Sequence, residues 1–460
     1  MILKLTQICQ DSRLLTSSTN NLPIRHLLAF LLITVVTVKY LTRHPRRVYL
    51  VEYACFGPNS NYRIAPASLI ENVRLAYFLD DNISFLSNIC RRSGLGDKTC
   101  LPSSHHYIPS IPSFTLARME AEQVIFAVVD DLSAKASTEP SKIDILIVNC
   151  ILMTMIPSMT NMIINRYKLR SDIQNMQLSG MGCSAGLIAV GLARNLLQTM
   201  PYGAHALLVS TEILTCNSYA GKKRSMQLTN MLFRMGGAAV LLSNSRTNGA
   251  RFQLLHTVRT STGAQDSAYR CAFQEDDEGN LGVNLSKDLV AMAGEALKAN
   301  ITTIAPLLLP VSEQLSFLLS SIAQKVFIMN KSRAGHQYVP NFGLAAEHFC
   351  IHAGGRAVID AVQRSLNLSD EQAESSRMTL HRFGNTSSSS VWYEMAYCEA
   401  KQSMRKGDRV WMIGSGAGYN CNSTVWKCIR PALSADSAWA NCIHRYPIEV
   451  KSQNKSNQLP

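Results

Sequence analysis

Short runs of aliphatic residues alternate with longer amphipathic segments along most of the chain. Between Thr115 and Ala136, apolar residues recur at helical spacing, which predicts a long amphipathic helix. Three short aliphatic runs, at residues 144–149, 205–210 and 237–243, are typical of buried strands. This alternation indicates an α/β architecture in which helices cover the faces of the sheets.

The longest apolar run lies near the N-terminus, at residues 27–38, and a basic group follows it at residues 43–47. The run is somewhat shorter than the about 20 residues of a membrane-spanning helix. Arginines just past an apolar segment are typical of a cytosolic flank. We therefore expect a membrane-anchor helix at residues 25–47, after a disordered leader at residues 1–24. A buried helix is the alternative, whereas a cleaved signal peptide fits poorly because no small-residue cleavage site follows.

The composition excludes several classes of protein. Of the 460 residues, 47% are hydrophobic and 17% are charged, which is too apolar for a disordered chain. Collagen and coiled-coil repeats are absent, and long apolar runs are too few for a transporter with many membrane spans. The length suits about three domains of ~150 residues each, or one duplicated domain.

The charge balance points to an anionic partner. The chain has 45 Lys and Arg against 32 Asp and Glu, a net charge of +13. Phosphate-bearing substrates and anionic lipids suit this charge, although a basic surface without a specific partner is an equal alternative. The sequence contains no basic run interleaved with aromatic residues, which would indicate nucleic-acid binding. We therefore expect no nucleic-acid partner. The 13 cysteines form no CxxC pair, which favours reduced, buried thiols in a cytosol-facing body.

A motif of small residues occurs twice in the chain. Residues 185–193 read Ala-Gly-x-x-Ala-Val-x-x-Ala, and residues 353–361 repeat the pattern at an offset of 168 (353 − 185). Chance is an alternative, because Ala, Gly and Val are common. A true repeat implies two related halves, each with a buried helix at a matching place. We expect these halves at residues 48–248 and 249–446, followed by a flexible tail at 447–460.

The first copy of the motif directly follows a candidate nucleophile. Residues 180–186 read Gly-Met-Gly-Cys-Ser-Ala-Gly, so Cys183 stands where a glycine-rich turn meets the start of an apolar helix. The free N–H groups and positive end of that helix would favour a thiolate. An inert cysteine in a tightly packed helix fits the same pattern.

The second copy follows two histidines, His348 and His352. On a helix they would share a face and suit zinc, but His352 precedes Ala-Gly-Gly, a poor helix interior, and no third ligand is evident. We therefore expect no metal. The repeat aligns His352 beside the position of Cys183 in the other half. Two helix N-termini could then meet at one site, one presenting a nucleophile and the other a base.

Two further segments complete the candidate site. Asn385 follows Gly384 and precedes a run of small hydroxyl residues, so its amide could point into a pocket or merely cap a helix. Residues 407–418 read as a strand that runs into a glycine-rich loop containing Gly414, Gly416 and Gly418. That loop lacks the Lys-Ser/Thr of a phosphate loop, and its match to a Rossmann pattern is weak.

These segments resemble the plant 3-ketoacyl-CoA synthases of fatty-acid elongation. The similarity extends from about residue 48 to residue 431. It includes Ser93-Gly-Leu-Gly96, Phe233-Arg-Met-Gly-Gly-Ala-Ala239, His256-Thr-Val-Arg-Thr260 and Ser286-Lys-Asp-Leu289. Because that family belongs to the thiolase superfamily, the resemblance implies a thiolase-like α/β fold of two similar halves in αβαβα layers. The cysteine would come from the first half and the histidine and asparagine from the second.

The resemblance also implies a chemistry. Cys183 would take a long acyl group from acyl-CoA as a thioester, with His352 supporting thiolate formation. Malonyl-CoA would then lose carbon dioxide while His352 and Asn385 stabilise the enolate, which attacks the acyl group. The product is a 3-ketoacyl-CoA two carbons longer. No cofactor is required, because acyl-CoA and malonyl-CoA are substrates.

Other residues take supporting places in this resemblance. The backbone of Cys183 and the loop with Gly414, Gly416 and Gly418 would hold the oxyanion. Three further histidines match family positions, and we expect them to support the site or the fold rather than to act directly: His256, His348 and His381.

The chain departs from the family pattern in several places. Members usually begin with two membrane spans, where this chain shows one weak apolar run. Residues 151–156 are apolar where a polar loop is usual, Ser218 stands where an aromatic is common, and Gly414-Ser415 replaces Ala-Phe. One alternative is a chalcone-synthase-like polyketide synthase. Another is a weakly active or non-catalytic elongase partner that binds acyl-CoA.

The resemblance extends to location and partners. We expect an endoplasmic reticulum membrane protein with its body in the cytosol, working as a homodimer with other fatty-acid elongase components. Residues 385–387 form a glycosylation sequon inside the proposed site, which argues against a lumenal body.

Overall fold

The computed structural model describes residues 26, 28–34, 46–77, 80–246, 249–286, 288–329, 338–417 and 419–448. The chain divides into two compact units, residues 1–46 and 47–460. Residues 28–34 of the first unit are helical, and their large apolar side chains are exposed. Within the described ranges, no helix is long and apolar enough to cross a membrane. The membrane anchor predicted at 25–47 is therefore not shown, and the leader predicted at 1–24 lies outside the described residues.

The described strands of the body form one nine-stranded mixed sheet and a separate hairpin. The order in the large sheet is β3-β2-β4-β5-β1-β6-β11-β10-β9. Its strands are β1 (Tyr49–Cys55), β2 (Ile145–Asn149), β3 (Gln174–Leu178), β4 (His205–Glu212), β5 (Gly236–Ser243), β6 (Phe252–Ser261), β9 (His348–Ile351), β10 (Arg409–Gly416) and β11 (Asn420–Cys428). The hairpin pairs β7 (Ala272–Glu275) with β8 (Leu281–Leu285). The three aliphatic runs are β2, β4 and β5, which confirms their prediction as strands.

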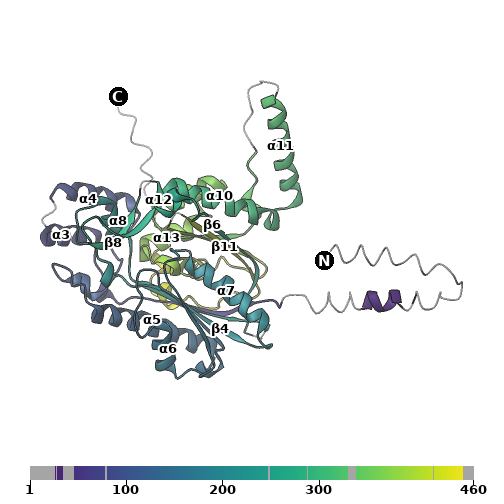
Figure 1. The fold of residues 1–460 in the computed structure, drawn as a ribbon, viewed down its shortest axis with the longest axis horizontal. Helices are drawn as coiled ribbons and strands as arrows, with labels where there is room; N and C mark the ends of the chain where they lie inside the picture. Colours follow the sequence, from purple (N-terminus) through teal and green to yellow (C-terminus); the bar gives the residue numbers. More distant parts are fainter. Residues whose placement is uncertain are drawn as a thin grey trace, which may run out of the picture. The chain divides into compact units, whose positions relative to one another are not determined.

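Helices cover the sheet on both faces (Figure 1). They are α3 (Pro66–Tyr77), α4 (Asp80–Ser93), α5 (Phe114–Ala136), α6 (Met159–Tyr167), α7 (Ala185–Thr199), α8 (Arg224–Leu232), α9 (Asp266–Tyr269), α10 (Leu289–Leu308), α11 (Val311–Met329), α12 (Arg356–Leu366), α13 (Glu374–Phe383), α14 (Ser390–Ala400) and α15 (Ser437–Ala440). The helix predicted from Thr115 to Ala136 is α5, so that prediction is confirmed.

Three hydrophobic clusters show how the layers stack. Along β2, Ile145 and Ile147 face a central cluster, whereas Leu146 and Val148 face an outer one, as expected when side chains alternate across a strand. The central cluster contains α7, α14 and strands from both ends of the sheet. One outer cluster adds α5 and α6, and the other adds α10 and α12. The order is thus helix, sheet, helix, sheet, helix, which agrees with the α/β layering predicted.

The two ends of the sheet have matching topology. Strands β1-β5-β4-β2 pair antiparallel, antiparallel and parallel, and strands β6-β11-β10-β9 pair in the same sequence. Strands β1 and β6 join these two groups through only two residue pairs, Tyr49 with Gln253 and Leu50 with Phe252. The first group lies within 48–248 and the second within 249–446, but these domain limits themselves stay a prediction.

The small-residue repeat does not mark equivalent helices. Helix α7 leads into β4, and the helix that leads into β10, the counterpart of β4, is α14 rather than α12. In the second copy, Ala353 and Gly354 lie in a turn before α12 begins, whereas Ala185 and Gly186 lie inside α7. The predicted correspondence between residues 185–193 and 353–361 is therefore wrong. Small residues serve close packing in one copy and a turn in the other.

Candidate active site

A glycine-rich turn carries Cys183 to the start of α7. Gly180 and Gly182 have φ angles of +69° and +70°, the left-handed region that glycine adopts at little cost. A Cβ on Gly182 would lie 2.6 Å from the backbone carbon of Gly416, so the two chains approach too closely for a side chain. Ser184 is the N-cap residue of α7. The sulfur is thus held at the helix N-terminus, as its sequence context predicts.

The resting form of Cys183 is the thiol. Burial raises the pKa of the Cys183 thiol to about 12, while a hydrogen bond from Ser387 lowers it and the charge of Glu212 raises it further. The expectation of a resting thiolate at the helix terminus is therefore wrong. Loss of hydration outweighs the favourable backbone groups, so the thiolate has to form with help from neighbouring residues.

His352 follows β9 and is nearly buried, with 4% of its surface exposed. Its Nδ1 lies 2.8 Å from the hydroxyl oxygen of Ser390, the first residue of α14. Burial lowers the pKa of His352 to about 4, so the ring is neutral at neutral pH. His348 belongs to a strand, which rules out the shared helix face of a zinc motif. In the described part of the chain, no group of three His, Cys, Asp or Glu side chains could hold a metal ion.

Asn385 lies between α13 and the short 3₁₀ helix η7 (Ser387–Ser389). Its Nδ2 donates a hydrogen bond to the carbonyl of Gly354 at 3.2 Å, and its Oδ1 accepts one from the N–H of Ser387 at 2.9 Å. Its backbone N–H and carbonyl bond to residues around Phe233. The orientation of the amide is therefore fixed from both sides.

A chain of contacts brings the three predicted catalytic residues together. The Ser387 hydroxyl lowers the pKa of the Cys183 thiol beside it, and the N–H of Ser387 donates to Asn385. The amide of Asn385 bonds to Gly354, and a Cβ on Gly354 would lie 3.0 Å from Nε2 of His352. Thiol, amide and imidazole are thus connected through the neighbouring residues Ser387 and Gly354. Their catalytic roles stay a prediction.

The predicted oxyanion loop has a different local structure. Gly414 and Gly416 lie inside β10, in register with Asn422 and Asn420 of β11, and Gly418 lies outside the described residues. The prediction of a loop at Gly414 and Gly416 is therefore wrong. The absence of side chains serves packing instead, because a Cβ on Gly414 would lie 3.2 Å from Ser184.

The hairpin of β10 and β11 also fixes the nucleophile turn by polar contacts. Asn422 Nδ2 donates to the Ser184 hydroxyl at 2.8 Å, Asn420 Nδ2 donates to the Met181 carbonyl at 3.2 Å, and the Tyr419 hydroxyl donates to the Gly180 carbonyl at 3.1 Å.

The three supporting histidines lie on separate elements. His348 on β9 lies 3.0 Å from the carboxylate of Asp408; burial opposes its charged form, but contacts with Cys398 and Asp408 raise the pKa of His348 to about 9. His381 on α13 lies 3.3 Å from the Tyr446 hydroxyl, and His256 lies on β6. Burial lowers the pKa of both His381 and His256. The hydrogen bonds described for His348 and His381 connect these two rings to the scaffold, and the supporting role of all three histidines stays a prediction.

Sequence reasoning missed three polar residues at the site. Glu212 ends β4 with none of its surface exposed, and it accepts a hydrogen bond from the Ser387 hydroxyl at 2.9 Å. The Ser390 hydroxyl hydrogen-bonds Nδ1 of His352 and so orients its ring. An acidic residue at the end of an otherwise aliphatic run was a signal for Glu212. The serine run after Asn385 was visible, but nothing distinguished one serine from the next.

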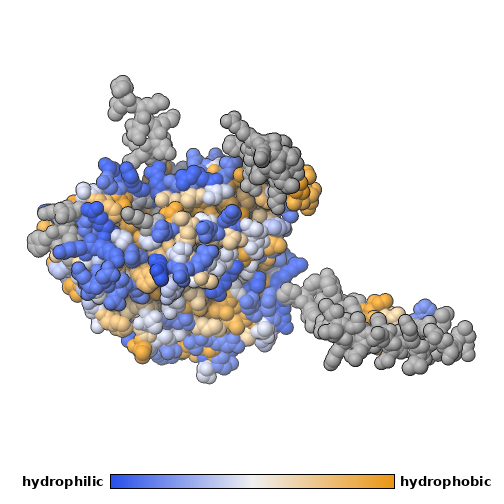
Figure 2. Space-filling model, turned by 45° about the horizontal axis from the view of Figure 1, so that its top comes forward, coloured by the Kyte–Doolittle hydropathy of each residue, from blue (hydrophilic) through white to orange (hydrophobic). Residues whose placement is uncertain are grey.

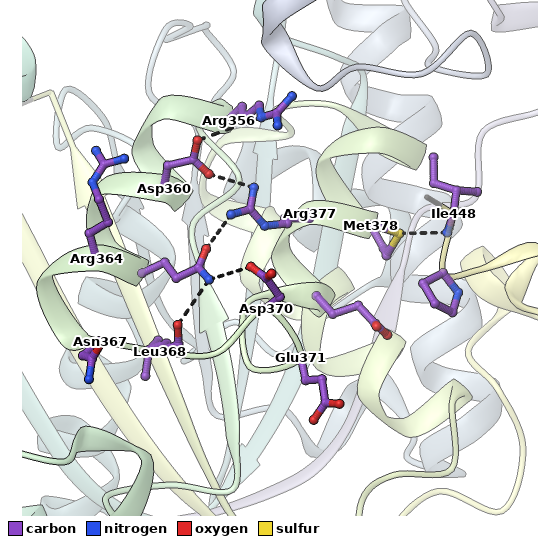
Figure 3. Close-up of a pocket in the computed structure, with 13 residues that line it drawn as sticks. Arg356, Asp360, Arg364, Asn367, Leu368, Asp370, Glu371, Arg377, Met378 and Ile448 are labelled. Atoms are coloured by element: carbon purple, nitrogen blue, oxygen red, sulfur yellow. Dashed lines mark hydrogen bonds and ion pairs between the residues drawn. The ribbon is translucent and has the colours of Figure 1, made fainter. Parts of the chain in front are cut away.

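Two cavities differ in their relation to the site. A small, mainly apolar cavity of about 20 Å³ adjoins the site, and Phe233 and Leu152 are among its lining residues. Phe233 pairs with Asn385, and the N–H of Leu152 donates to Glu212. A larger cavity of about 620 Å³ holds none of the predicted site residues. Figure 3 shows Asp360 between Arg356 and Arg377, and it forms an ion pair with each of them. This second cavity belongs to the scaffold.

Comparison with protein families matches nearly the whole body. Residues 40–326 match the FAE1/type III polyketide synthase-like family. Residues 345–428 match the C-terminal region of 3-oxoacyl-[acyl-carrier-protein] synthase III.

Individual relatives agree with these matches. The chain is 54% identical over 429 residues to 3-ketoacyl-CoA synthase 6 of Arabidopsis thaliana, covering 92% of this chain and 85% of that protein. It is equally similar to 3-ketoacyl-CoA synthase 5 of the same plant, with 86% of that protein covered.

Solved structures show the same fold at low identity. CsyB complexed with CoA-SH aligns with a TM-score of 0.63 at 20% identity, over 83% of this chain and all of CsyB. Tetrahydroxynaphthalene synthase from Streptomyces coelicolor, a bacterial type III polyketide synthase, aligns with a TM-score of 0.63 at 19% identity, over 84% of this chain and all of that enzyme.

Proposed function

Because the chain belongs to the FAE1/type III polyketide synthase-like family, and within it to the 3-ketoacyl-CoA synthases, we propose that it condenses malonyl-CoA with a very-long-chain acyl group carried on Cys183. One observation supports this most directly: the contacts that run from Cys183 through Ser387, Asn385 and Gly354 to His352. They gather a nucleophile and two hydrogen-bond donors at one place.

The first step is acyl transfer to Cys183. The thiol loses its proton as the sulfur attacks the acyl-CoA carbonyl, and CoA leaves with a proton. The small cavity beside Phe233 and Leu152, of about 20 Å³, has room for about one small group. Leu152 belongs to the apolar segment 151–156, so this departure from the usual family sequence lies close to the proposed site.

The second step is decarboxylation of malonyl-CoA. One Nδ2 hydrogen of Asn385 is used by the Gly354 carbonyl, which leaves the other for the thioester oxygen. If the Ser390 hydroxyl donates to Nδ1 of the neutral His352, its Nε2 carries the hydrogen and becomes the second donor. The two donors stabilise the enolate that remains after carbon dioxide leaves. This enolate attacks the acyl thioester on Cys183 and releases a 3-ketoacyl-CoA.

This chemistry needs neither a metal ion nor a redox cofactor, since both carbon substrates arrive as CoA thioesters. The net charge of +13 suits the phosphates of CoA. The type III polyketide synthases among the structural neighbours share the fold at about 20% identity, whereas 54% identity connects this chain to the 3-ketoacyl-CoA synthases. We therefore favour elongation over polyketide synthesis.

The test uses microsomes that carry the protein, labelled malonyl-CoA and a panel of long and very-long acyl-CoAs. We expect 3-ketoacyl products two carbons longer, lost in Cys183→Ala and retained in Cys216→Ala, another half-buried thiol. Product from the Cys183→Ala variant would remove Cys183 as the nucleophile. Aromatic or lactone products from small starters would favour a polyketide synthase, and acyl-CoA binding without any product would favour the non-catalytic partner.

We also propose that the body lies on a membrane surface, and helix α11 supports this. Its residues Val311, Leu315, Leu318, Leu319 and Ile322 form one helical stripe, and each is at least half exposed. Figure 1 shows α11 projecting from the layers, and Figure 2 shows apolar surface at this end of the body.

Polar residues of α11 bond to neighbouring segments. Glu313 accepts hydrogen bonds from the Tyr338 hydroxyl at 2.7 Å and the Asn341 N–H at 2.8 Å, and Gln314 bonds the Leu309 carbonyl at 2.9 Å. An apolar groove of about 860 Å³ lies between α10 and α11. Three residues of the stripe, Val311, Leu315 and Leu318, also line this groove. An exposed apolar surface on a basic protein suits the interface of an anionic bilayer.

A tryptophan probe tests this surface. The native Trp392, Trp411, Trp426 and Trp439 are all fully buried, so Leu319→Trp supplies an exposed indole. We expect brominated acyl chains in phosphatidylcholine/phosphatidylserine vesicles to quench its fluorescence, and to leave that of Leu433→Trp, an exposed control, unchanged. Equal quenching of both variants, or of neither, would contradict the proposal.

For location, we propose the endoplasmic reticulum membrane with the body in the cytosol, as a homodimer that works with other elongase components. The resemblance to plant elongase condensing enzymes supports this, together with the sequon at residues 385–387 next to the proposed nucleophile. Protease added to intact microsomes should digest the body. Full protection without detergent would overturn the topology, and crosslinking that yields only monomers would overturn the dimer.

A further inference from the structure

We propose that Ser387 and Glu212 form a hydrogen-bond switch that sets the nucleophilicity of Cys183. In this switch Ser387 is a positioning residue, because its single hydroxyl hydrogen can serve either the Glu212 carboxylate or the sulfur, but not both. The proposal deepens the proposed function and rests on Cys183 being its nucleophile.

Ser387 is held between the two groups by its backbone. Its hydroxyl donates to Glu212 Oε2 at 2.9 Å, and it lies beside the Cys183 thiol, whose pKa it lowers. Its φ of +56° is left-handed, which a serine adopts only at a cost. The hydrogen bond from its N–H to Asn385 Oδ1 holds this conformation. This strained backbone conformation places the Ser387 hydroxyl beside both the Glu212 carboxyl and the Cys183 thiol.

Glu212 is fully buried, and its described partners are neutral donors. Its Oε1 accepts from Cys150 Sγ at 3.5 Å, Ile151 N–H at 3.2 Å and Leu152 N–H at 2.9 Å. Burial raises the pKa of Glu212 to about 7, and these donors lower it in part. A carboxylate in this position can therefore gain or lose its proton near neutral pH.

The titratable groups that face Glu212 come from several elements. Cys150 follows β2, Cys183 precedes α7, and Glu120 lies on α5. Glu120 is a second buried carboxyl whose charge interacts with that of Glu212, and burial raises its pKa to about 7. The described neighbours that titrate are thus two thiols and one acid. The charges of Glu120 and Glu212 disfavour each other, whereas the Cys150 thiol donates to Glu212 and lowers its pKa.

Two arrangements follow from the single hydrogen of the Ser387 hydroxyl. When Glu212 is ionised, Ser387 donates to it, and the negative charge keeps Cys183 a thiol. When Glu212 takes up a proton, its new O–H can donate to the Ser387 oxygen. Ser387 then turns its own hydrogen to the sulfur and stabilises the thiolate. The switch itself changes only O–H and hydrogen bonds, and the proton taken up by Glu212 comes from solvent. When the thiolate forms, the S–H bond of Cys183 breaks and its proton passes to solvent.

Glu212→Gln imitates the protonated acid permanently, because its amide N–H₂ can donate to Ser387. We expect this variant to lower the pKa of Cys183 and to speed its alkylation by iodoacetamide at pH 7.5 about tenfold. Ser387→Ala should slow alkylation, and Glu212→Gln in the Ser387→Ala background should regain little of that loss. Glu120→Gln is the matched control, since it removes a buried carboxylate that does not bond Ser387.

The readout is the rate of modification of the Cys183 peptide by mass spectrometry, in the full-length protein between pH 6 and 9. No substrate is present, so the result does not depend on whether condensation occurs. Thermal unfolding of each variant separates loss of fold from loss of reactivity. A Glu212→Gln profile within twofold of wild type, an equal shift in Glu120→Gln, or an undiminished shift in the Ser387→Ala background would each overturn the switch.

Discussion

The side-chain amide of Asn385 donates to the backbone carbonyl of Gly354, two residues after His352. This hydrogen bond joins the segment that follows β9 to the segment that precedes α14. It therefore fixes the spacing of the two donors that we place around the substrate thioester. The same amide accepts from Ser387, so its orientation is set without any contact from the substrate.

Replacing Asn385 with aspartate should abolish malonyl-CoA decarboxylation. A carboxylate cannot donate to the Gly354 carbonyl or to the thioester oxygen, and its charge opposes the enolate. We expect carbon dioxide release from labelled malonyl-CoA to fall by about 100-fold or more. Retention of more than a tenth of the wild-type rate would contradict a donor role for Asn385.

Ser390→Ala should slow condensation by removing the hydroxyl that orients His352. The ring would lose its 2.8 Å partner at Nδ1 and with it the preference for hydrogen on Nε2. We expect kcat to fall about 10- to 100-fold with little change in KM. Ser389→Ala is the neighbouring control, because its hydroxyl donates only to the Thr386 carbonyl. Equal losses in both variants would point to a general packing effect.

Gly182→Ala and Gly180→Ala form a matched pair for the nucleophile turn. Both glycines have φ near +70°, so alanine costs about 1–2 kcal/mol of conformational strain at either site. Only Gly182 also meets the Gly416 backbone, at 2.6 Å, whereas a Cβ on Gly180 has no neighbour within 4 Å. We expect urea unfolding to show a larger loss for Gly182→Ala and an activity loss confined to it. Equal destabilisation would exclude the close approach as the cause.

His348 should stabilise the fold at low rather than high pH. Its pKa in the folded protein is raised to about 9 from an ordinary value near 6.5, so folding favours the protonated ring. The stabilisation is complete below pH 6.5 and disappears as pH rises through 9. Asp408→Asn removes one cause of the shift, so its loss of unfolding free energy should be larger at pH 6 than at pH 9.5. Urea unfolding at both values gives this comparison, and an equal loss at the two would contradict it.

Much of the architecture was predictable from local pattern. The segments 145–149 and 205–212 are short aliphatic runs, because both faces of each strand are buried. Such a pattern indicates a buried strand. The motifs around Cys183, His352 and Asn385 identified these residues because each combines glycine turns with a chemically distinctive side chain. The structure places them together through contacts between residues 31 to more than 200 positions apart.

Other features depended on tertiary packing and were not visible in the pattern. Gly414 lies in a strand although glycine favours loops, because Ser184 occupies the space that a side chain would need. Helix α12 begins after Ala353 and Gly354, so an identical spacing of small residues has a different structure from its copy. The role of Glu212 depends on the left-handed backbone of Ser387, which only the folded contacts impose.

Helix α14 has a consequence for how the protein is made. Its residues 390–399 are all buried, and it fills the central layer against strands from both ends of the sheet. A ribosome must therefore translate most of the message before the inner surface of the first five strands is covered. Until then the nascent chain exposes a large hydrophobic surface, to which molecular chaperones can bind. Solubility and catalytic competence are thus acquired together, late in synthesis.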